Sequence, residues 1–411
     1  MRKRNGSVLG VICIISLVIM VCIKAEAQEI LHLGASVPFS FRIGIELKKI
    51  LEMNADLLNK SGGLTVGGKT YMVKYHIYDD KFDADAGRAA HERLVFEDKV
   101  KFVVGTFFSG SVLASLRITE PNKIPIFSNA SSDKLLAPDI KYFVHTMPTK
   151  APNSLSKLLT EIRPNIKTVL ICVYDNEFGH TVGPYMEKAY KTYGLTTFPT
   201  IYFKQGLADF SPIATKTISL KPDHFIAAGF STGGESIQVV KALRDAGYSG
   251  TVELAFLTQP VLDDIVAKVG KKGADGIFSL IIDPTFPGIK NKPAGAAEFR
   301  ENYERYYGKW EVDGLQWMDC WYAWLAAVRK ANSLDPDRVI AAIDQSVRVL
   351  SPFGVGKFFT RPDLGNNRYC DYVQPIRLGE TKNGKIEFLT EKDADYWIDA
   401  LEKIFGMKIT K

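Results

Sequence analysis

Cysteine and histidine are scarce in this sequence, which has five cysteines and six histidines among 411 residues. Cys13 and Cys22 lie in the N-terminal segment, and Cys172, Cys320 and Cys370 are far apart with no Cys-x-x-Cys pair. The histidines lack the i, i+4 pairing of a zinc-binding helix. These absences argue against a metal site, and we expect buried thiols with one disulfide at most, and no cofactor.

A large excess of charge is also lacking. Lysine and arginine number 52 against 46 acidic residues, and four of the basic and one of the acidic residues fall within residues 1–27, which leaves a net charge of +3. Nucleic-acid-binding proteins concentrate positive charge on one face, so we expect no nucleic-acid partner. Beyond the N-terminal segment, no apolar run is long enough to span a membrane.

The N-terminal segment has the three parts of a secretory signal peptide. Residues 2–4 are basic, residues 8–23 are almost all apolar, and residues 25–27, Ala-Glu-Ala, are a small-x-small cleavage site. The apolar run is short for a spanning helix of about 20 residues, and Cys22 lacks the small preceding residue that lipid attachment requires. We predict a signal peptide over residues 1–27 and a periplasmic location; an uncleaved membrane anchor is the alternative.

Strand-like and helix-like segments alternate along the mature chain, residues 28–411. Residues 29–37 favour a strand, residues 45–63 an amphipathic helix closed by two glycines, and residues 71–80 a strand ending in two carboxylates. Single helices between strands indicate parallel sheets, and right-handed crossovers favour a doubly wound topology. Further strands are expected at 101–105, 124–128, 168–175, 197–203, 224–230 and 252–257, and helices at 83–98, near 151, at 184–194 and at 235–248.

Two proline-containing segments, 145–153 and 281–288, divide this series. We therefore predict an α/β fold of two doubly wound parallel-sheet lobes joined by a three-crossing hinge. The helical residues 298–333 are expected to return to the first lobe, and 351–359 and 372–380 to be strands, with a turn at Asn383-Gly384. The predicted domains are a first lobe of residues 28–146 with 284–351 and a second lobe of residues 147–283 with 352–411.

One catalytic motif is formally present. GFSTG (229–233) fits the Gly-x-Ser-x-Gly elbow of α/β-hydrolases. In those enzymes the triad histidine follows the serine, whereas all six histidines here precede Ser231. Asp79 and Asp80 could be paired carboxylates, but aspartates at a strand end more often cap a helix or bind a loop. We predict that the protein is not an enzyme.

The segment VVGTFFSG (103–110) places two phenylalanines and a serine between a buried strand and a helix start. In an open α/β sheet, ligands meet helix N-termini at this position, where unpaired N–H groups and the helix dipole favour an anion. The loop lacks the additional glycines and the lysine of a phosphate site. It therefore predicts a smaller anion, such as a carboxylate, next to an apolar neighbour.

Several motifs, taken in order, resemble one family. They are the strand ending YDD (78–80), the helix DADAGRAAHERLV, the loop VVGTFFSGS, the strand end IPIFSNASS and the turn VYDNEFG. With the signal peptide, they resemble the type I periplasmic substrate-binding proteins of ABC transporters, of the leucine/isoleucine/valine-binding (branched-chain amino acid) kind. The resemblance spans nearly the whole mature chain. It implies a ligand held between two lobes that close about a hinge.

The resemblance also implies site residues in the first lobe. Ser109 matches a serine that holds the ligand carboxylate together with backbone N–H groups, and Phe107 and Phe108 match residues whose backbone lines the same wall. Ala130 matches a residue whose carbonyl accepts from a ligand ammonium. Ser132 matches a hydroxyl position that contacts the backbone of an amino-acid ligand.

In the second lobe, Phe178 and Phe230 match positions that aromatic residues usually hold. The family's amino-acid binders also carry a glutamate there, which pairs with the ligand ammonium. The matching position in this chain is Gln259, with Thr258 as the alternative. Gln259 is uncharged, so a buried ammonium would lose its counter-ion.

The first loop of the chain also departs from the family pattern. Phe39, Phe41 and Arg42 replace a loop that is usually rich in serine and glycine. Arg42 could bind a carboxylate with its guanidinium fork, or it could be an exposed arginine without a role in binding.

These observations predict a receptor rather than a catalyst. The expected ligand is a small organic carboxylate with an apolar or aromatic body, or a branched-chain or hydrophobic amino acid. An amide or urea-like ligand is an alternative, because Gln259 and the two serines suit neutral polar groups. The resemblance implies permease subunits of an ABC importer in the inner membrane as partners; a periplasmic sensor subunit that signals to a membrane kinase is the alternative.

Overall fold

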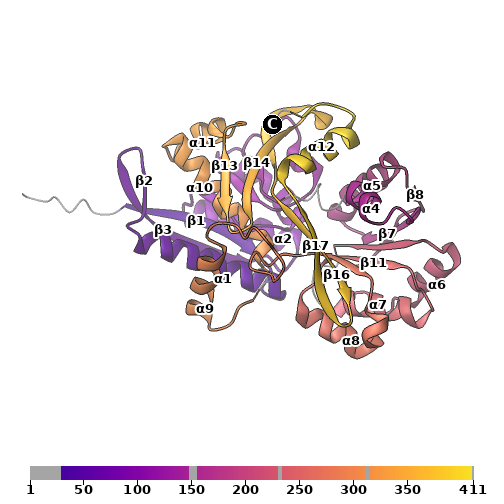
Figure 1. Ribbon diagram of the computed structural model, residues 1–411. Helices are drawn as coiled ribbons and strands as arrows, with labels where there is room; N and C mark the ends of the chain where they lie inside the picture. Colours follow the sequence, from indigo (N-terminus) through magenta and orange to yellow (C-terminus); the bar gives the residue numbers. More distant parts are fainter. Residues whose placement is uncertain (1–28, 148–154, 230–233, 312–313, 410–411) are drawn as a thin grey trace, which may run out of the picture.

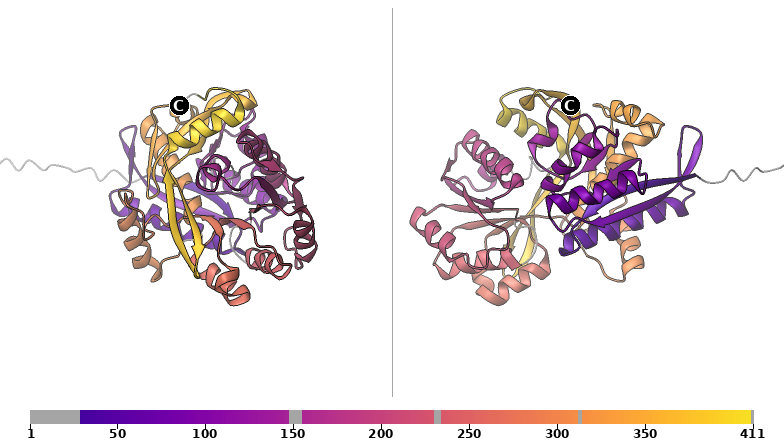
Figure 2. Two further views of the ribbon diagram at one scale, coloured as in Figure 1. Left: turned by 45° about the vertical axis from the view of Figure 1, so that its right-hand side comes forward. Right: turned by 180° about the vertical axis from the view of Figure 1, so that it is seen from behind.

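The computed structural model describes residues 29–147, 155–229, 234–311 and 314–409. The chain folds into two α/β lobes, which lie side by side with a small third sheet next to them (Figure 1). The view from behind in Figure 2 shows the same two lobes. Within the described residues, no helix is long and apolar enough to cross a membrane.

The first lobe is built on a six-stranded sheet of order β2-β3-β1-β4-β5-β6. The strands run parallel except β2, which pairs antiparallel with β3. The N-terminal part contributes β1 (Glu29–Val37), α1 (Arg42–Lys60), β2 (Leu64–Val66), β3 (Lys69–Asp79), α2 (Ala84–Phe96), β4 (Phe102–Val104), α3 (Ser109–Thr119), β5 (Ile126–Ser128), the 3-10 helix η1 (Asp133–Leu136) and β6 (Phe143–His145). A later part returns with α9 (Ala296–Tyr307), η3 (Leu315–Trp317), α10 (Asp319–Ala331) and α11 (Pro336–Ala342).

The second lobe is built on a sheet of order β17-β16-β12-β11-β10-β7-β8, with β9 also paired to β7. Strands β7 to β12 are parallel, and β16 and β17 extend the sheet as an antiparallel hairpin. Its elements are α4 (Ser156–Ile162), β7 (Thr168–Tyr174), α5 (Glu177–Thr192), β8 (Thr196–Thr197), β9 (Ile201–Phe203), α6 (Ser211–Leu220), β10 (His224–Ala228), α7 (Gly234–Asp245), β11 (Thr251–Phe256), α8 (Gln259–Gly273), β12 (Ile277–Leu280), β16 (Ile376–Lys382) and β17 (Lys385–Lys392).

Three strands near the C-terminus form a separate sheet. They are β13 (Arg348–Ser351), β14 (Gly354–Arg361) and β15 (Asn366–Val373), with the 3-10 helix η4 (Pro362–Leu364) between the last two. The final helix α12 (Ala394–Phe405) packs against α5 and against β14 and β15.

The chain passes between the lobes after β6, after β12 and after β15, which gives three crossings. The predicted lobe boundary between residues 351 and 352 separates β13 from β14, although these two strands pair in one sheet.

Two segments that were expected to be single strands are each divided between two strands. Residues 351–359 span the end of β13 and most of β14, with Pro352 in the turn. Residues 372–380 span the end of β15 and the start of β16, which belong to different sheets. Pro375 lies at this break because it has no N–H group for a ladder. The expected turn at Asn383-Gly384 is confirmed, since both residues have positive φ and join β16 to β17.

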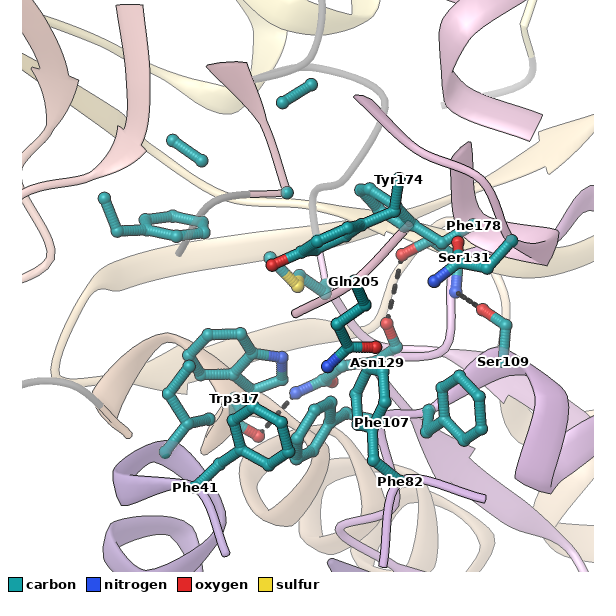
Figure 3. A pocket seen from close by; sticks show the side chains of 18 of the residues that line it. Phe41, Phe82, Phe107, Ser109, Asn129, Ser131, Tyr174, Phe178, Gln205 and Trp317 are labelled. Atoms are coloured by element: carbon teal, nitrogen blue, oxygen red, sulfur yellow. Dashed lines mark hydrogen bonds between the residues drawn. The ribbon is translucent and has the colours of Figure 1, made fainter. Parts of the chain in front are cut away.

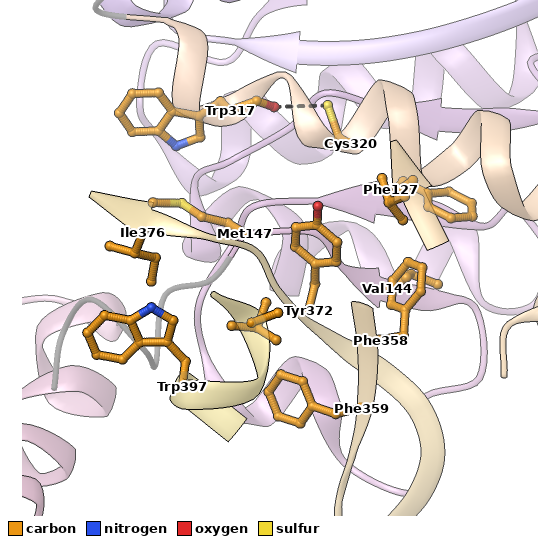
Figure 4. Packing of buried hydrophobic residues seen from close by; sticks show 14 of the residues in the cluster. Phe127, Val144, Met147, Trp317, Cys320, Phe358, Phe359, Tyr372, Ile376 and Trp397 are labelled. Carbon is orange, nitrogen blue, oxygen red and sulfur yellow. Dashed lines mark hydrogen bonds between the residues drawn. The ribbon is translucent and has the colours of Figure 1, made fainter. Parts of the chain in front are cut away.

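The small sheet packs on the first lobe through a continuous apolar core. Phe127 of β5 and Val144 of β6 share this core with Phe358 of β14 and Tyr372 of β15, and Trp397 of α12 joins it (Figure 4).

Elsewhere in the lobe, a methyl group on Gly87 would lie 1.8 Å from Oγ of Ser111, so glycine lets α2 approach α3 closely. Cys172, Cys320 and Cys370 are buried free thiols, so the expected burial is confirmed and no disulfide joins them.

A buried ion cluster joins the chain segments that precede two of the crossings. Arg361, which is 1% exposed, donates to Asp133 at 3.1 Å, to Asp371 at 3.0 Å and to Asp363 at 2.8 Å. Nδ1 of His145 lies 2.6 Å from Asp371. Burial opposes ionisation, but His145 and Arg361 lower the pKa of Asp371 to about 2. The cluster therefore ties β6, the last strand before the first crossing, to β15, the last before the third.

Asp319 at the start of α10 predicts a measurable pH dependence of stability. Burial raises the pKa of its carboxyl to about 8, although Ser351 and Tyr372 lower it in part. In the unfolded chain the carboxyl of Asp319 loses its proton near about pH 4. Below that pH it is protonated in both states, so the stabilisation of the folded protein is complete there. This stabilisation is lost as the pH rises towards 8, by up to about 1.4 kcal/mol per pH unit.

We expect Asp319→Asn, which cannot ionise, to remove this loss. Urea unfolding of both proteins between about pH 5 and about pH 8 measures it. The free energy of unfolding of the parent protein should fall more steeply with pH than that of the variant. Parallel curves would show that Asp319 is ionised in the folded protein.

Candidate ligand-binding site

A cavity of about 130 Å³ lies between the two lobes. It is close in size to a cavity of about 150 Å³ that accommodates benzene. Both lobes contribute to its walls (Figure 3). Its aromatic lining residues are Phe41, Phe82, Phe107, Phe108, Tyr174, Phe178, Phe256 and Trp317.

The first-lobe wall is the turn from β4 into α3. Gly105 has φ of +121°, and a Cβ there would lie 2.4 Å from Leu51, so this turn requires glycine. Phe108 is the N-cap of α3 and offers no side-chain cap. Ser109, the first helical residue, is 3% exposed and lines the cavity. The wall thus brings an uncapped helix N-terminus and a hydroxyl group to the cavity.

Aromatic side chains from distant parts of the sequence surround this turn. The ring of Phe82 stacks on Phe108 with 4.1 Å between centroids. Trp317 of η3 packs against Phe107 at 5.5 Å and against Phe256 of the second lobe at 5.8 Å. Trp317 reaches the cavity only because the chain returns to the first lobe after its second crossing. Sequence reasoning missed both Phe82 and Trp317.

Asp79 and Asp80 shape the loop that carries Phe82. Oδ1 of Asp79 accepts from the N–H groups of Phe39 and Lys81, and Oδ1 of Asp80 accepts from the N–H of Phe82 at 3.0 Å. The expectation that these aspartates bind a loop is confirmed. Burial raises the pKa of Asp80 to about 6. Lys81 and Phe82 both have positive φ, so these bonds support a strained turn.

The second-lobe wall mixes aromatic, amide and small side chains. Tyr174 ends β7, and Asn176 caps α5 by accepting from the N–H of Gly179 at 3.0 Å. Gln205 projects into the cavity from the loop after β9 (Figure 3). Outside the cavity, Glu235 accepts from the Tyr174 hydroxyl and from the N–H of Gly206, so it fixes both the ring and the loop.

Glu253 on β11 is the one charged residue among the described residues that line the cavity. It is 6% exposed. Its Oε2 accepts from the hydroxyl of Tyr190 at 3.3 Å and lies 3.1 Å from Nε2 of His224. Sequence reasoning missed Glu253, because a single glutamate inside an apolar strand gives no distinctive pattern.

Four of the residues predicted from the sequence line the cavity together: Phe107, Phe108, Ser109 and Phe178. Phe230 and Ser231 lie outside the described residues. Ala130 is 1% exposed, packs in the core of the first lobe and is not among the residues that line the cavity.

Gln259 and Arg42 are not brought to the cavity. Gln259 is the first residue of α8 and is exposed, and its amide donates to Asp263 at 2.8 Å and to the carbonyl of Gly384 at 3.0 Å. The alternative, Thr258, is the buried N-cap position and also lies outside the lining. Arg42 is largely exposed and pairs with Glu46 at 3.5 Å, whereas its neighbours Phe41 and Ile43 do line the cavity.

Ser132 makes a contact other than the ligand contact that the family resemblance implies. Its hydroxyl caps η1 and donates to Oε1 of Glu177 on α5 at 2.7 Å. Lys134 pairs with the other oxygen of Glu177 at 2.8 Å. Because η1 belongs to the first lobe and α5 to the second, these bonds join the lobes directly across the cleft.

Two parallel-sheet lobes, three crossings and an aromatic cavity between facing strand ends define a two-lobed solute-binding protein. The sequence model of the periplasmic binding protein family matches residues 37–385. The chain belongs to this family, and it is accordingly a binding protein and not an enzyme.

Relatives and solved structures agree with this placement. The chain is 24% identical over 319 residues to the Leu/Ile/Val-binding protein homolog 8 of Brucella abortus, covering 73% of this chain and 76% of the relative. The structure resembles the leucine binding protein LivK of Thermotoga maritima, with a TM-score of 0.71, 17% identity and coverage of 89% and 100%. It also resembles an R. palustris ABC transporter solute binding protein in complex with 4-hydroxybenzoate, with a TM-score of 0.69, 18% identity and coverage of 89% and 98%.

The bonds of Glu177 predict a shift between closed and open forms. Glu177→Ala removes both bonds across the cleft, and most of the effect should come from Ser132 because Lys134 is 70% exposed. A loss of about 1–2 kcal/mol lowers the ratio of closed to open protein about 5- to 30-fold. Small-angle scattering of the ligand-free protein should then give a larger radius of gyration.

The matched control is Glu92→Ala, which removes an exposed glutamate on α2 that pairs with Arg88 within the same helix. It should leave the radius unchanged. Equal radii for the parent protein and Glu177→Ala would mean that these bonds do not hold the lobes together.

Proposed function

We propose that the protein is a periplasmic receptor that captures a small carboxylic acid with an aromatic or apolar body and delivers it to an ABC importer. Removal of residues 1–27 as a signal peptide would place it in the periplasm, and permease subunits would receive the closed, loaded form. The observation that carries this proposal is the uncapped N-terminus of α3, which opens with Ser109 onto an aromatic cavity.

The carboxylate end of the ligand belongs at α3. The first N–H groups of a helix have no partners within the helix, and the dipole there favours an anion. Phe108 supplies no side-chain cap, and no acidic residue lies in the first turn of α3. Oγ of Ser109 accepts from the N–H of Ser131 at 3.1 Å, which leaves its own proton for an acceptor on the ligand.

The body of the ligand belongs among the phenylalanines. Phe107 of the first lobe and Phe178 of the second lobe both line the cavity (Figure 3), so a planar ligand would meet aromatic side chains from both lobes. No lysine, arginine or histidine occurs among the described lining residues, so the helix N-terminus is the main positive group for an anion. The complex of a similar protein with 4-hydroxybenzoate is consistent with such a ligand.

A hydrophobic α-amino acid is the second candidate. Glu253 favours it, because this carboxylate in the cavity wall could pair with an ammonium group. The similarity to a Leu/Ile/Val-binding protein homolog and to LivK also supports this candidate.

Thermal unfolding of the ligand-stripped mature protein tests the proposal. The panel comprises benzoate, 4-hydroxybenzoate, hexanoate, leucine and benzamide. A ligand at about 100 times its dissociation constant adds roughly 2.7 kcal/mol of stability, which gives a clear upward shift. We expect a shift with the aromatic acids and none with benzamide. A shift with leucine alone would favour the second candidate, and stabilisation by benzamide but no carboxylate would contradict the proposal.

Ser109→Ala should weaken the binding of aromatic carboxylates about tenfold, since a hydrogen bond to a charged group contributes about 1.5 kcal/mol or more. Titration calorimetry measures the change. Ser211→Ala is the matched control, because Ser211 also begins a helix but does not line the cavity. Equal affinities in the parent protein and Ser109→Ala would remove Ser109 from the site.

A further inference from the structure

Glu253 lies on β11, a second-lobe strand that lines the cavity. It is the third residue of β11, two positions before Ala255 and therefore on the same face of the sheet. Ala228, Gly229 and Ala255 line the cavity nearer the strand ends. Because these residues have at most a methyl side chain, the cavity extends past them as far as Glu253.

Only one of the two carboxylate oxygens of Glu253 is occupied within the protein. Oε2 receives both contacts, from the hydroxyl of Tyr190 and from Nε2 of His224. Oε1 has no partner in the part of the chain that the structure describes. Because Glu253 lines the cavity, its second oxygen is an acceptor available to a ligand. An acceptor without a protein partner in a ligand cavity points to a donor on the ligand.

We propose that the ligand carries a hydroxyl group remote from its carboxylate, and that this hydroxyl donates a hydrogen bond to Oε1 of Glu253. The inference rests on the proposed function and names the substrate class more closely. Ser109 is on the first-lobe wall and Glu253 on the second-lobe wall, so one molecule that satisfies both must be bifunctional. A ring-hydroxylated aromatic acid has this form and also fits the aromatic lining.

The surroundings of Glu253 leave one oxygen for a further hydrogen bond. Tyr190 and His224 both lie against Oε2, and Nδ1 of His224 contacts Oγ1 of Thr251 at 2.7 Å. A ligand hydroxyl at Oε1 supplies one proton and displaces neither residue. A ligand ammonium would use the same oxygen, and the binding measurements below distinguish the two donors.

Titration calorimetry with benzoate, 4-hydroxybenzoate and 4-methoxybenzoate tests the inference. We expect the parent protein to bind 4-hydroxybenzoate at least tenfold more tightly than benzoate. It should bind 4-methoxybenzoate, whose oxygen carries no proton, no better than benzoate. This comparison needs no variant, so it stands even where a substitution at Glu253 prevents folding.

Glu253→Gln should reduce the preference. Its amide oxygen can keep the bonds from Tyr190 and His224, which leaves the NH2 group, a donor, at the cavity. The ligand hydroxyl can then only accept a weaker, uncharged bond. The ratio of affinities for 4-hydroxybenzoate and benzoate should fall, while benzoate still binds. Glu92→Gln makes the same chemical change on the surface of α2 and should keep the preference.

The outcomes separate this inference from the proposed function. Equal affinity of the parent protein for benzoate and 4-hydroxybenzoate would overturn the role of Glu253 but leave a carboxylate receptor. Tight leucine binding that Glu253→Gln abolishes would show that the donor is an ammonium, which also overturns the inference. Absence of binding to every carboxylate in the panel would instead contradict the proposed function.

Discussion

The rest of the structure depends on a buried ion cluster that fixes where two of the crossings leave the first lobe. Arg361 binds Asp133, Asp363 and Asp371, and Asp371 also contacts His145. Removing one member of such a cluster leaves an uncompensated buried charge, so its members hold one another in place. The cluster anchors β6 and β15 immediately before the chain crosses to the second lobe.

Each wall of the cavity offers the ligand different chemical groups. The first lobe offers the N–H groups and dipole of α3 with the hydroxyl of Ser109. The second lobe offers acceptors, from the amide of Gln205 and the carboxylate of Glu253, on strands and loops that Glu235 helps to fix. Between them the aromatic rings exclude water and strengthen both polar interactions. A ligand with complementary ends would thus favour closure of the lobes.

The fold was largely predictable because parallel strands and their helices carry local signals. Buried apolar runs mark β7 and β10, and Asp83 caps α2 from its position directly before the helix. The third sheet was not foreseen. Pro352 and Pro375 interrupt apolar runs that look continuous, and only the pairing of β13, β14 and β15 shows that a separate sheet begins there.

The site was predictable where it is local in sequence and not where it depends on tertiary structure. The turn at Phe107, Phe108 and Ser109 combines a strand end with a helix start, so a short segment reveals it. Trp317 joins the cavity from more than 200 residues away, through a crossing that no local pattern indicates. Sequence reasoning chose Gln259 and missed Glu253. Glu253 lies within β11 and lines the cavity, whereas Gln259 follows the strand and begins α8, and the sequence does not show where β11 ends.

We propose that the cavity orients the ligand carboxylate towards the first lobe. A crystal structure of the protein grown with 4-hydroxybenzoate tests this orientation most directly. We expect the carboxylate within hydrogen-bond distance of Oγ of Ser109 and the first N–H groups of α3, with the ring between Phe107 and Phe178. A carboxylate bound at the second-lobe wall, or a ligand outside the cavity, would contradict it.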